Sequence, residues 1–431
     1  MSAPVATAAP DEGVIFGPLD LLNGYAPVFL TAFVVTLLAT PIVRKIAVNA
    51  GIIDMPDRQR KLHAYPVAYL GGLAVFLGVV ASFIAAAFLT RGEAGLLRVV
   101  PFSVVIGMVA IVFTGLADDI WKWDPRLKVA GQLVAAAALA IEDVGPKLAE
   151  GVLTPMFGPP DMSLFSIGAM VIRNSELFYW VGTALVALFV VGGCNSANLI
   201  DGLDGLLSGT TAIMALGLLG ISLIMAMTDP VADPEKSLVG MRVMLSLALL
   251  GATLGFLPFN FNPAIIFLGD CGSLLLGYLC VVIIMSFGEH GQTELVVAGL
   301  VVFSLPILDT VLAIIRRKMA GMPFHSADSN HIHHLLKRSL GTVKRAVFAL
   351  YAITVCFAIL GVAMAATRQL TGTRVLAVMS LAFAFFAFIS AMAIKAARQA
   401  SWQIQMKTAE RASDAAPTAP SAELAPARDP R

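Results

Sequence analysis

The chain has 431 residues, of which 58% are apolar and only 13% are charged. This composition is that of an integral membrane protein and excludes a soluble domain. The formal net charge of +1 at pH 7 identifies no class of partner, and we expect none that is a nucleic acid. The four cysteines lack paired spacing, which excludes a disulfide framework and a CxxC metal site.

Apolar runs follow one another along the chain, each close to the roughly 20 residues that cross a bilayer. They cover residues 28–48, 70–89, 99–117, 127–141, 177–194, 206–227, 243–259, 271–287, 295–315, 346–366 and 375–394. The expected fold class is therefore all-α, a polytopic membrane protein with about 11 transmembrane helices. The fourth run is short and rich in alanine, and the connection 142–176 has room for a hairpin or an interfacial segment.

The two ends of the chain differ from this membrane domain, which we place at 26–396. Residues 1–25 have no basic segment before their first apolar run, so no cleaved signal peptide is expected. Residues 397–431 are rich in Ala, Pro, Ser, Glu and Arg, a composition too poor in apolar bulk to fold alone. We expect a disordered tail there.

The orientation follows from Lys and Arg, which are retained on the cytoplasmic side. Of the 29 basic residues, 21 fall in the segments 44–68, 118–128 and 316–345 and in the tail from Lys395. The N-terminal segment is therefore expected outside the membrane and the C-terminus in the cytoplasm. The loops that follow the odd-numbered runs then share the cytoplasmic face.

Dense polar clusters occur in five of these cytoplasmic loops. They cover residues 54–66, 118–128, 195–206, 260–273 and 325–334. Such groups are costly in a membrane chain and mark functional sites. Five loops from separate parts of the chain can therefore form one site.

The residue types in these loops indicate phosphate chemistry. Oxygen donors without cysteine favour Mg²⁺, with Mn²⁺ as the alternative, over zinc. They are Asp118, Asp119, Asn195, Asn198, Asp201, Asp204 and Asp270. Cations or donors for phosphate oxygens come from Arg60, Lys61, Lys128, His331, His333 and His334. Both sets together predict a nucleoside diphosphate bridged by metal, and the bilayer setting predicts a lipid-borne second substrate.

The order of these motifs resembles one family. From Asp54 to Arg345 the chain carries the loop 54–66, the Asp118-Asp119 pair, NSANLIDGLDGL at 195–206, FLGDCGS at 267–273 and HIHH at 331–334. This order is similar to that of the polyprenyl-phosphate N-acetylhexosamine-1-phosphate transferases, relatives of phospho-MurNAc-pentapeptide translocase. The likeness is greatest to the branch that transfers GlcNAc-1-phosphate from UDP-GlcNAc to undecaprenyl phosphate.

The resemblance implies a role for each candidate residue. It implies that Asp270 and Asn198 are magnesium ligands and that Asp118 and Asp119 are catalytic, with Asp118 as a base for the lipid phosphate. The residues implied to bind the substrate are Lys61, Lys128, Asp201, Asp204, Asn260, Phe267, His331, His333 and His334. Among them Phe267 would stack on uracil, whereas Lys128 and the histidines would face the diphosphate. The family also implies a bacterial inner-membrane location, with a homodimer left open.

Several alternatives stay open at this point. Asn195 could close a turn, and Asp309 fits a structural ion pair or a helix-packing hydrogen bond better than catalysis. The chemistry could be direct attack or a covalent aspartyl-phosphate route, and direct attack is preferred because a phosphate monoester is already ionised near pH 7. A transporter would bury its polar groups near the midplane and show repeated halves, which this chain does not. The sugar, another UDP-amino sugar being the alternative to UDP-GlcNAc, is not determined by sequence.

Overall fold

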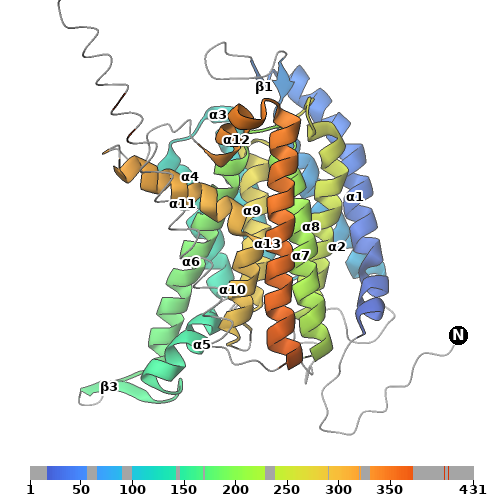
Figure 1. Ribbon diagram of the computed structural model, residues 1–431. Coiled ribbons are helices and arrows are strands. Elements are labelled where there is room, and N and C mark those ends of the chain that lie inside the picture. Colours follow the sequence, from blue (N-terminus) through green and yellow to red (C-terminus); the bar gives the residue numbers. More distant parts are fainter. Residues whose placement is uncertain are drawn as a thin grey trace, which may run out of the picture.

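The structure is a computed structural model that describes residues 17–55, 66–89, 100–141, 146–167, 170–228, 238–289, 291–319, 321, 331–371, 402 and 406. Within these ranges the fold consists of thirteen α-helices and two short antiparallel strand pairs. The helices form an elongated bundle with most axes parallel (Figure 1). The all-α class expected from the apolar runs is confirmed.

Eight helices in the described part of the chain are long and apolar enough to cross a membrane. They are α1 (Pro18–Asn49), α2 (Gly71–Leu89), α3 (Phe102–Trp121), α6 (Asn174–Ile200), α7 (Leu206–Thr228), α8 (Val239–Asn260), α9 (Gly269–Ser286) and α13 (Val343–Thr371). Each overlaps one of the expected apolar runs over most of its length. This gives a multi-pass membrane protein, and the expected total of about 11 spans is not confirmed within the described residues.

Two of the remaining runs differ from the expectation. The fourth forms α4 (Pro125–Ile141), whose 17 residues reach about 26 Å, less than the roughly 30 Å of hydrocarbon in a bilayer. The ninth is not one straight helix: α10 (Thr293–Val302) and α11 (Ser304–Met319) meet at an angle of 78°. Pro306 lies in the first turn of α11, where a missing N–H costs nothing, so the sequence favours a new helix there. The run 375–394 lies outside the described residues.

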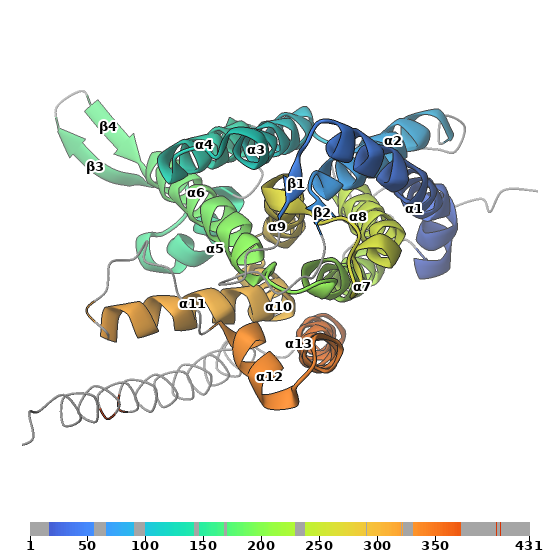
Figure 2. The same ribbon diagram turned by 90° about the horizontal axis from the view of Figure 1, so that it is seen from above.

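The break sends α11 sideways out of the bundle (Figures 1 and 2). α11 lies beside α6, and its last turn carries three basic residues. The short helix α12 (Ile332–Leu340) follows it in the described chain and packs on α13. The segment expected to be a single span therefore places its second half close to the motif-bearing end of the bundle.

The connection 142–176 contains structure of its own. It forms α5 (Pro146–Phe157) and the antiparallel pair β3 (Ser163–Ile167) and β4 (Met170–Arg173), which begins with a bulge between Ser163 and Phe165. Of the two alternatives left open for this connection, the structure shows the hairpin. Figure 1 shows it at the end of the bundle away from α12, where it projects beyond the helices.

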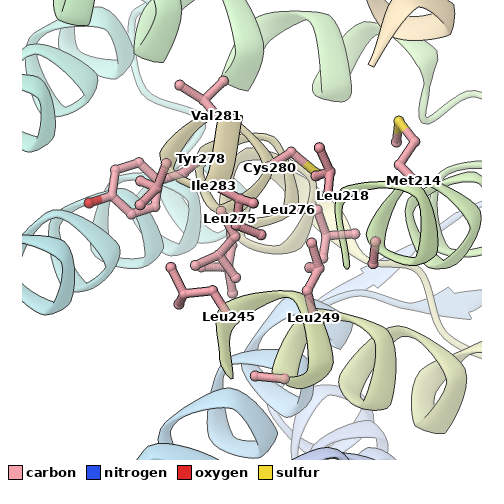
Figure 3. Packing of buried hydrophobic residues seen from close by; sticks show 14 of the residues in the cluster. Met214, Leu218, Leu245, Leu249, Leu275, Leu276, Tyr278, Cys280, Val281 and Ile283 are labelled. Atoms are coloured by element: carbon pink, nitrogen blue, oxygen red, sulfur yellow. The ribbon is translucent and has the colours of Figure 1, made fainter. Parts of the chain in front are cut away.

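Helix α9 is the centre of the molecule, and 94% of its span is buried (Figure 2). Large apolar side chains such as Leu275 and Ile283 fill the space between α9 and its neighbours (Figure 3). At its first turn the packing is closer: a Cβ on Gly72 of α2 would lie 2.0 Å from the Gly272 nitrogen, and one on Gly115 of α3 2.4 Å from the Cys271 Cα. Small residues bring helices into backbone contact in this way. The start of α9 is thereby fixed against α2 and α3.

A second small sheet closes the motif-bearing end. Strands β1 (Ile53–Asp54) and β2 (Val67–Ala68) pair antiparallel, and Ala68 forms a parallel bridge with Ile266. The Phe267 amide donates to the Ala68 carbonyl at 2.8 Å. The loop before α9 is thus tied to the loop before α2.

Candidate active site

One lysine joins two carboxylates at the motif-bearing end of the bundle. Lys128, in the first turn of α4, has its Nζ 3.2 Å from Asp118 Oδ2 near the end of α3. The same ammonium also pairs with Asp270 Oδ2 in the first turn of α9. The three side chains are 18–23% exposed, so the cluster opens to solvent. Three helices that are far apart in sequence therefore place their charged groups around one point.

Asp119 faces the backbone of α9. Its Oδ1 accepts from the Asp270 amide at 2.8 Å and its Oδ2 accepts from the Cys271 amide at 3.1 Å. These are orphan N–H groups of a helix N-terminus, where an anion is also favoured by the helix dipole. The preceding residue, Gly269, has φ +69° and no room for a Cβ, which would lie 2.5 Å from Asp119 Oδ2. Asp119 thus positions Asp270.

The stretch 195–206, expected as a loop, is helical up to Ile200. Asn195 donates to Gln132 Oε1 on α4 at 2.8 Å, so it joins two helices. Asn198 donates to Asp270 Oδ1 at 2.8 Å and to Ser273 Oγ at 2.9 Å. Both carboxamides have partners while their backbones stay helical, and a polar sequence here does not require a loop. Asn198 belongs to the carboxylate cluster, and Asn195 lies beside it.

Asp201 begins the true loop between α6 and α7. Burial raises the pKa of its carboxyl to about 8, and repulsion from neighbouring carboxylates, Asp270 foremost, adds to the shift. Several acidic groups thus lie close together with Lys128 as the cation that pairs with two of them. Ionising all of them together requires an additional positive charge.

Asp204 and Asn260 are engaged inside the protein. Asp204 Oδ2 accepts from the Asn262 carboxamide at 2.8 Å. Asn260 is 3% exposed, accepts from Ser208 Oγ at 2.7 Å and donates to the Ile266 carbonyl at 3.1 Å. Both residues were predicted to bind the nucleotide, and the structure gives them contacts that shape the loop 261–266. Their substrate contacts stay predictions.

Phe267 lies at the rim of the cluster, partly exposed, one position before the turn into α9. Its ring makes an edge contact with Tyr69, the centroids being 5.9 Å apart. This leaves an aromatic surface next to the carboxylates, and the predicted stacking on uracil stays untested. Lys61, also predicted to bind substrate, lies outside the described residues.

The histidine motif is fixed by Asp309. This carboxylate on α11 is fully buried, its Oδ2 lying 2.8 Å from His331 Nδ1 and its Oδ1 accepting from the Ile332 amide at 2.7 Å. Sequence reasoning placed Asp309 in a structural ion pair or packing contact, and the structure shows that its partner is a candidate site residue. The signal available was an aspartate inside an apolar run.

His333 is wedged between α11 and the loop after α6. A Cβ on Gly202 would lie 2.2 Å from His333 Nε2, so only glycine permits the approach. Burial, with the neighbouring histidines, lowers the pKa of His333 to about 3, and this ring is neutral. His334 is half-buried, with its pKa also lowered by burial. His333 and His334 therefore offer neutral ring nitrogens rather than cations.

Comparison with known proteins identifies the family. The model of glycosyl transferase family 4 matches residues 101–288. The chain is 33% identical over 336 residues to the probable undecaprenyl-phosphate N-acetylglucosaminyl 1-phosphate transferase of Bacillus subtilis, a match that covers 77% of this chain and 82% of that protein. The chain belongs to glycosyl transferase family 4.

Other relatives in the family extend the match. The decaprenyl-phosphate N-acetylglucosaminephosphotransferase of Mycobacterium tuberculosis is 34% identical over 351 residues, covering 77% of this chain and 80% of that protein. The undecaprenyl-phosphate alpha-N-acetylglucosaminyl 1-phosphate transferase of Yersinia pestis is 27% identical over 363 residues, covering 83% and 89%. The resemblance drawn from the ordered motifs is confirmed.

Two carboxylates of this family 4 chain offer oxygen donors, although no three His, Cys, Asp or Glu side chains in the described part of the chain are grouped to hold a metal ion. Asp118 and Asp270 both direct an oxygen at one positive group, the Lys128 ammonium. Carboxylate oxygens without sulfur donors suit Mg²⁺ or Mn²⁺. Burial raises the pKa of Asp201, so added positive charge would favour its ionised form. Asn198 is bonded to Asp270 through its amide nitrogen, and its predicted role as a ligand stays a prediction.

Proposed function

We propose that this family 4 protein transfers GlcNAc-1-phosphate from UDP-GlcNAc to undecaprenyl phosphate and releases UMP. The observation that carries the proposal is the shared cluster of Asp118, Lys128 and Asp270 at one end of a multi-pass bundle. Relatives that carry N-acetylglucosaminyl 1-phosphate transferase in their names match more than three quarters of the chain. The reaction would be the first membrane step in making a cell-surface polysaccharide.

The chemistry is displacement at the β-phosphorus of the UDP-sugar. An oxygen of the lipid phosphate forms a bond to this phosphorus, the bond to the bridging oxygen breaks, and UMP leaves with the electron pair. Bound Mg²⁺ would supply charge neutralisation and alignment of the diphosphate oxygens. Asp270 and Asp118 would hold the ion, and Asn198 would position Asp270 through its 2.8 Å hydrogen bond.

Asp118 would handle the acceptor, and the neighbouring Lys128 would face the diphosphate. Asp118 is partly exposed and lies 3.2 Å from an ammonium that attracts a phosphate anion. A lipid phosphate is already largely ionised near pH 7, its second pKa being about 6. Direct attack therefore needs orientation more than proton removal, and we prefer it to an aspartyl-phosphate intermediate. A phospho-sugar adduct formed on the protein from UDP-sugar without lipid would contradict this preference.

The location follows from the same proposal. The motif-bearing end would face the cytoplasm of a bacterial inner membrane, as the excess of basic residues there predicts. UDP-sugars are soluble and would enter from that side, whereas the lipid phosphate would come from the bilayer. Accessibility of single cysteines, introduced into a cysteine-free chain near Trp121 and near Phe157, to an impermeant reagent distinguishes the two faces. Labelling of the Trp121 position from outside intact cells would contradict the orientation.

The deciding experiment is UMP release by the purified protein. With undecaprenyl phosphate and Mg²⁺, UDP-GlcNAc is expected to give more UMP than UDP-GalNAc or a deoxy-amino UDP-sugar. Chelation of the metal should abolish release, and Mn²⁺ should restore part of it. Preference for another UDP-sugar would change the substrate but keep the reaction class, whereas no release with any of them would refute the proposal.

A further inference from the structure

Asp309 occupies an unusual place for a carboxylate. It lies on α11, just past the break in the helix, and its side chain is 0% exposed. A buried carboxylate is strongly unfavourable unless it is paired or hydrogen-bonded. Both of its oxygens have partners, and both partners lie at the start of the histidine motif, 22 and 23 positions further along the chain.

One of these partners is the N-terminus of α12. The Ile332 amide, at the first position of that helix, donates to Asp309 Oδ1 at 2.7 Å. A carboxylate there satisfies an orphan N–H and complements the helix dipole. Asp309 therefore fixes where α12 begins.

The other partner is the His331 ring. Asp309 Oδ2 lies 2.8 Å from His331 Nδ1, so this hydrogen bond occupies one of the two ring nitrogens. The ring is stacked on His333 at 5.5 Å with 13° between the planes, and His333 touches the loop that starts at Asp201. The ring orientation is therefore set, and Nε2 is its remaining polar edge.

The His331 ring is surrounded by one carboxylate and two further histidines. Asp309 faces it from α11, and His333, whose pKa is lowered to about 3, faces it as a neutral ring from α12. His334, with its pKa also lowered, is the other titratable neighbour in this motif. The buried Asp309 carboxylate thus holds the Nδ1 edge of the ring, as a buried aspartate orients a histidine in other sites, and the Nε2 edge is the one that can meet an anion.

We propose that Asp309 is a positioning residue that holds His331 so that its Nε2–H binds a phosphate oxygen of the nucleoside diphosphate. The inference rests on the proposed function, in which such a diphosphate is the donor. It assigns Asp309 to the site through His331, without contact between Asp309 and the substrate. It also gives the bend between α10 and α11 a role in the site, because the bend brings Asp309 to the histidine motif.

A double-mutant cycle tests this link. The dissociation constant for UDP in the presence of Mg²⁺ and the KM for UDP-GlcNAc are measured for wild type, Asp309→Asn, His331→Ala and the double variant. Each single change is expected to weaken UDP binding about 10-fold, the value of one charge-assisted hydrogen bond. The double variant should be no weaker than His331→Ala, since residues acting as one unit are not additive. Additive losses would refute the proposal.

Two further variants separate positioning from stability. Glu294→Gln removes another buried carboxylate, which is 4% exposed and pairs with Arg368 at 2.6 Å at the other end of the bundle. This control should leave UDP binding unchanged. If Asp309→Asn does not fold, His331→Asn replaces it in the test. The asparagine keeps a donor where Nδ1 of His331 lies but has no group in the place of Nε2. This variant should lose as much affinity for UDP as His331→Ala. Wild-type affinity in His331→Asn would overturn the proposal. UDP binding without UMP release in the wild type would instead refute the proposed reaction.

Discussion

The two ends of the bundle both bury charged side chains, but they do so differently. At the end away from the motifs, Arg242 pairs with Glu289 and Arg368 with Glu294, one cation for each anion. The Arg242 pair is 2% and 8% exposed. At the motif end, one Lys128 serves two carboxylates, and Asp119 and Asp201 lie close by.

This difference separates structural charges from functional ones. In a matched pair each charge already has an opposite partner, so the pair needs no further ion. Arg242 illustrates this, since it pairs with Glu289 and also donates to the Ser286 carbonyl at 3.2 Å. A cluster with more acids than bases keeps all of its carboxylates ionised only with added positive charge, which here is proposed to arrive as Mg²⁺ with the substrate. Excess charge and partial exposure, more than burial alone, mark the site.

The largest expected effect is that of Asp270→Asn. It removes the carboxylate at which Lys128 and Asn198 converge, so transfer should fall at least about 1000-fold, the several kcal/mol that a metal ion contributes. The measurement is UMP release as a function of Mg²⁺. Asp20→Asn, at the exposed start of α1, is the matched control and should behave as wild type. Wild-type turnover in Asp270→Asn would remove this residue from the site.

Lys128→Gln should have the next largest effect. The change leaves Asp118 and Asp270 without their shared cation, and transfer should fall about 100-fold, as for loss of one preorganised donor. Steady-state kinetics with both substrates would show it. Lys122→Gln, in the left-handed residue that ends α3, is the matched lysine control. Equal activity of the two variants would mean that Lys128 is a structural cation.

Gly202→Ala tests the contact between the loop after α6 and the histidine motif. The added methyl would lie 2.2 Å from His333 Nε2 and must push the ring away, with an overpacking cost of about 1–3 kcal/mol. We expect about 10-fold weaker UDP binding with the bundle intact. Gly192→Ala on α6 has open space for its methyl and should be neutral. Identical UDP affinity in both variants would separate His333 from the site.

Glu289→Gln should have the smallest effect on transfer. It leaves Arg242 buried without its full partner, a change that typically lowers the free energy of unfolding by about 3 kcal/mol. Thermal unfolding in detergent should therefore occur at a lower temperature while the KM for UDP-sugar stays constant. A raised KM would mean that the two ends of the bundle are coupled and that their charges do not divide as described.

The sequence predicts much of this architecture because long apolar runs have few alternatives in a membrane. Hydropathy alone does not reveal the break at Phe303, because the residues on both sides are apolar, and Pro306 is the local signal for it. The sequence also misassigns Asn195 and Asn198 to a loop, because carboxamides with partners on α4 and α9 can stay on a helix.

The candidate site is predicted less completely. Ordered motifs indicate which loops take part, and the structure brings Asp118, Lys128, Asn198 and Asp270 together. His331, the partner of Asp309, lies 22 residues further along the chain. No periodic pattern in the sequence connects these two positions. Contacts of this kind depend on tertiary geometry, which local pattern does not contain.

The burial of α9 has a mechanical consequence. Bilayers differ in thickness, and helices that touch lipid respond by tilting or bending. Helix α9 touches almost none, and its first turn is locked by backbone contact with Gly72 and Gly115 and by Asp119. We therefore expect outer helices such as α1, of which 28% is buried, to respond to membrane thickness while Asp270 stays in place. The cluster should keep its geometry in thin and thick membranes alike.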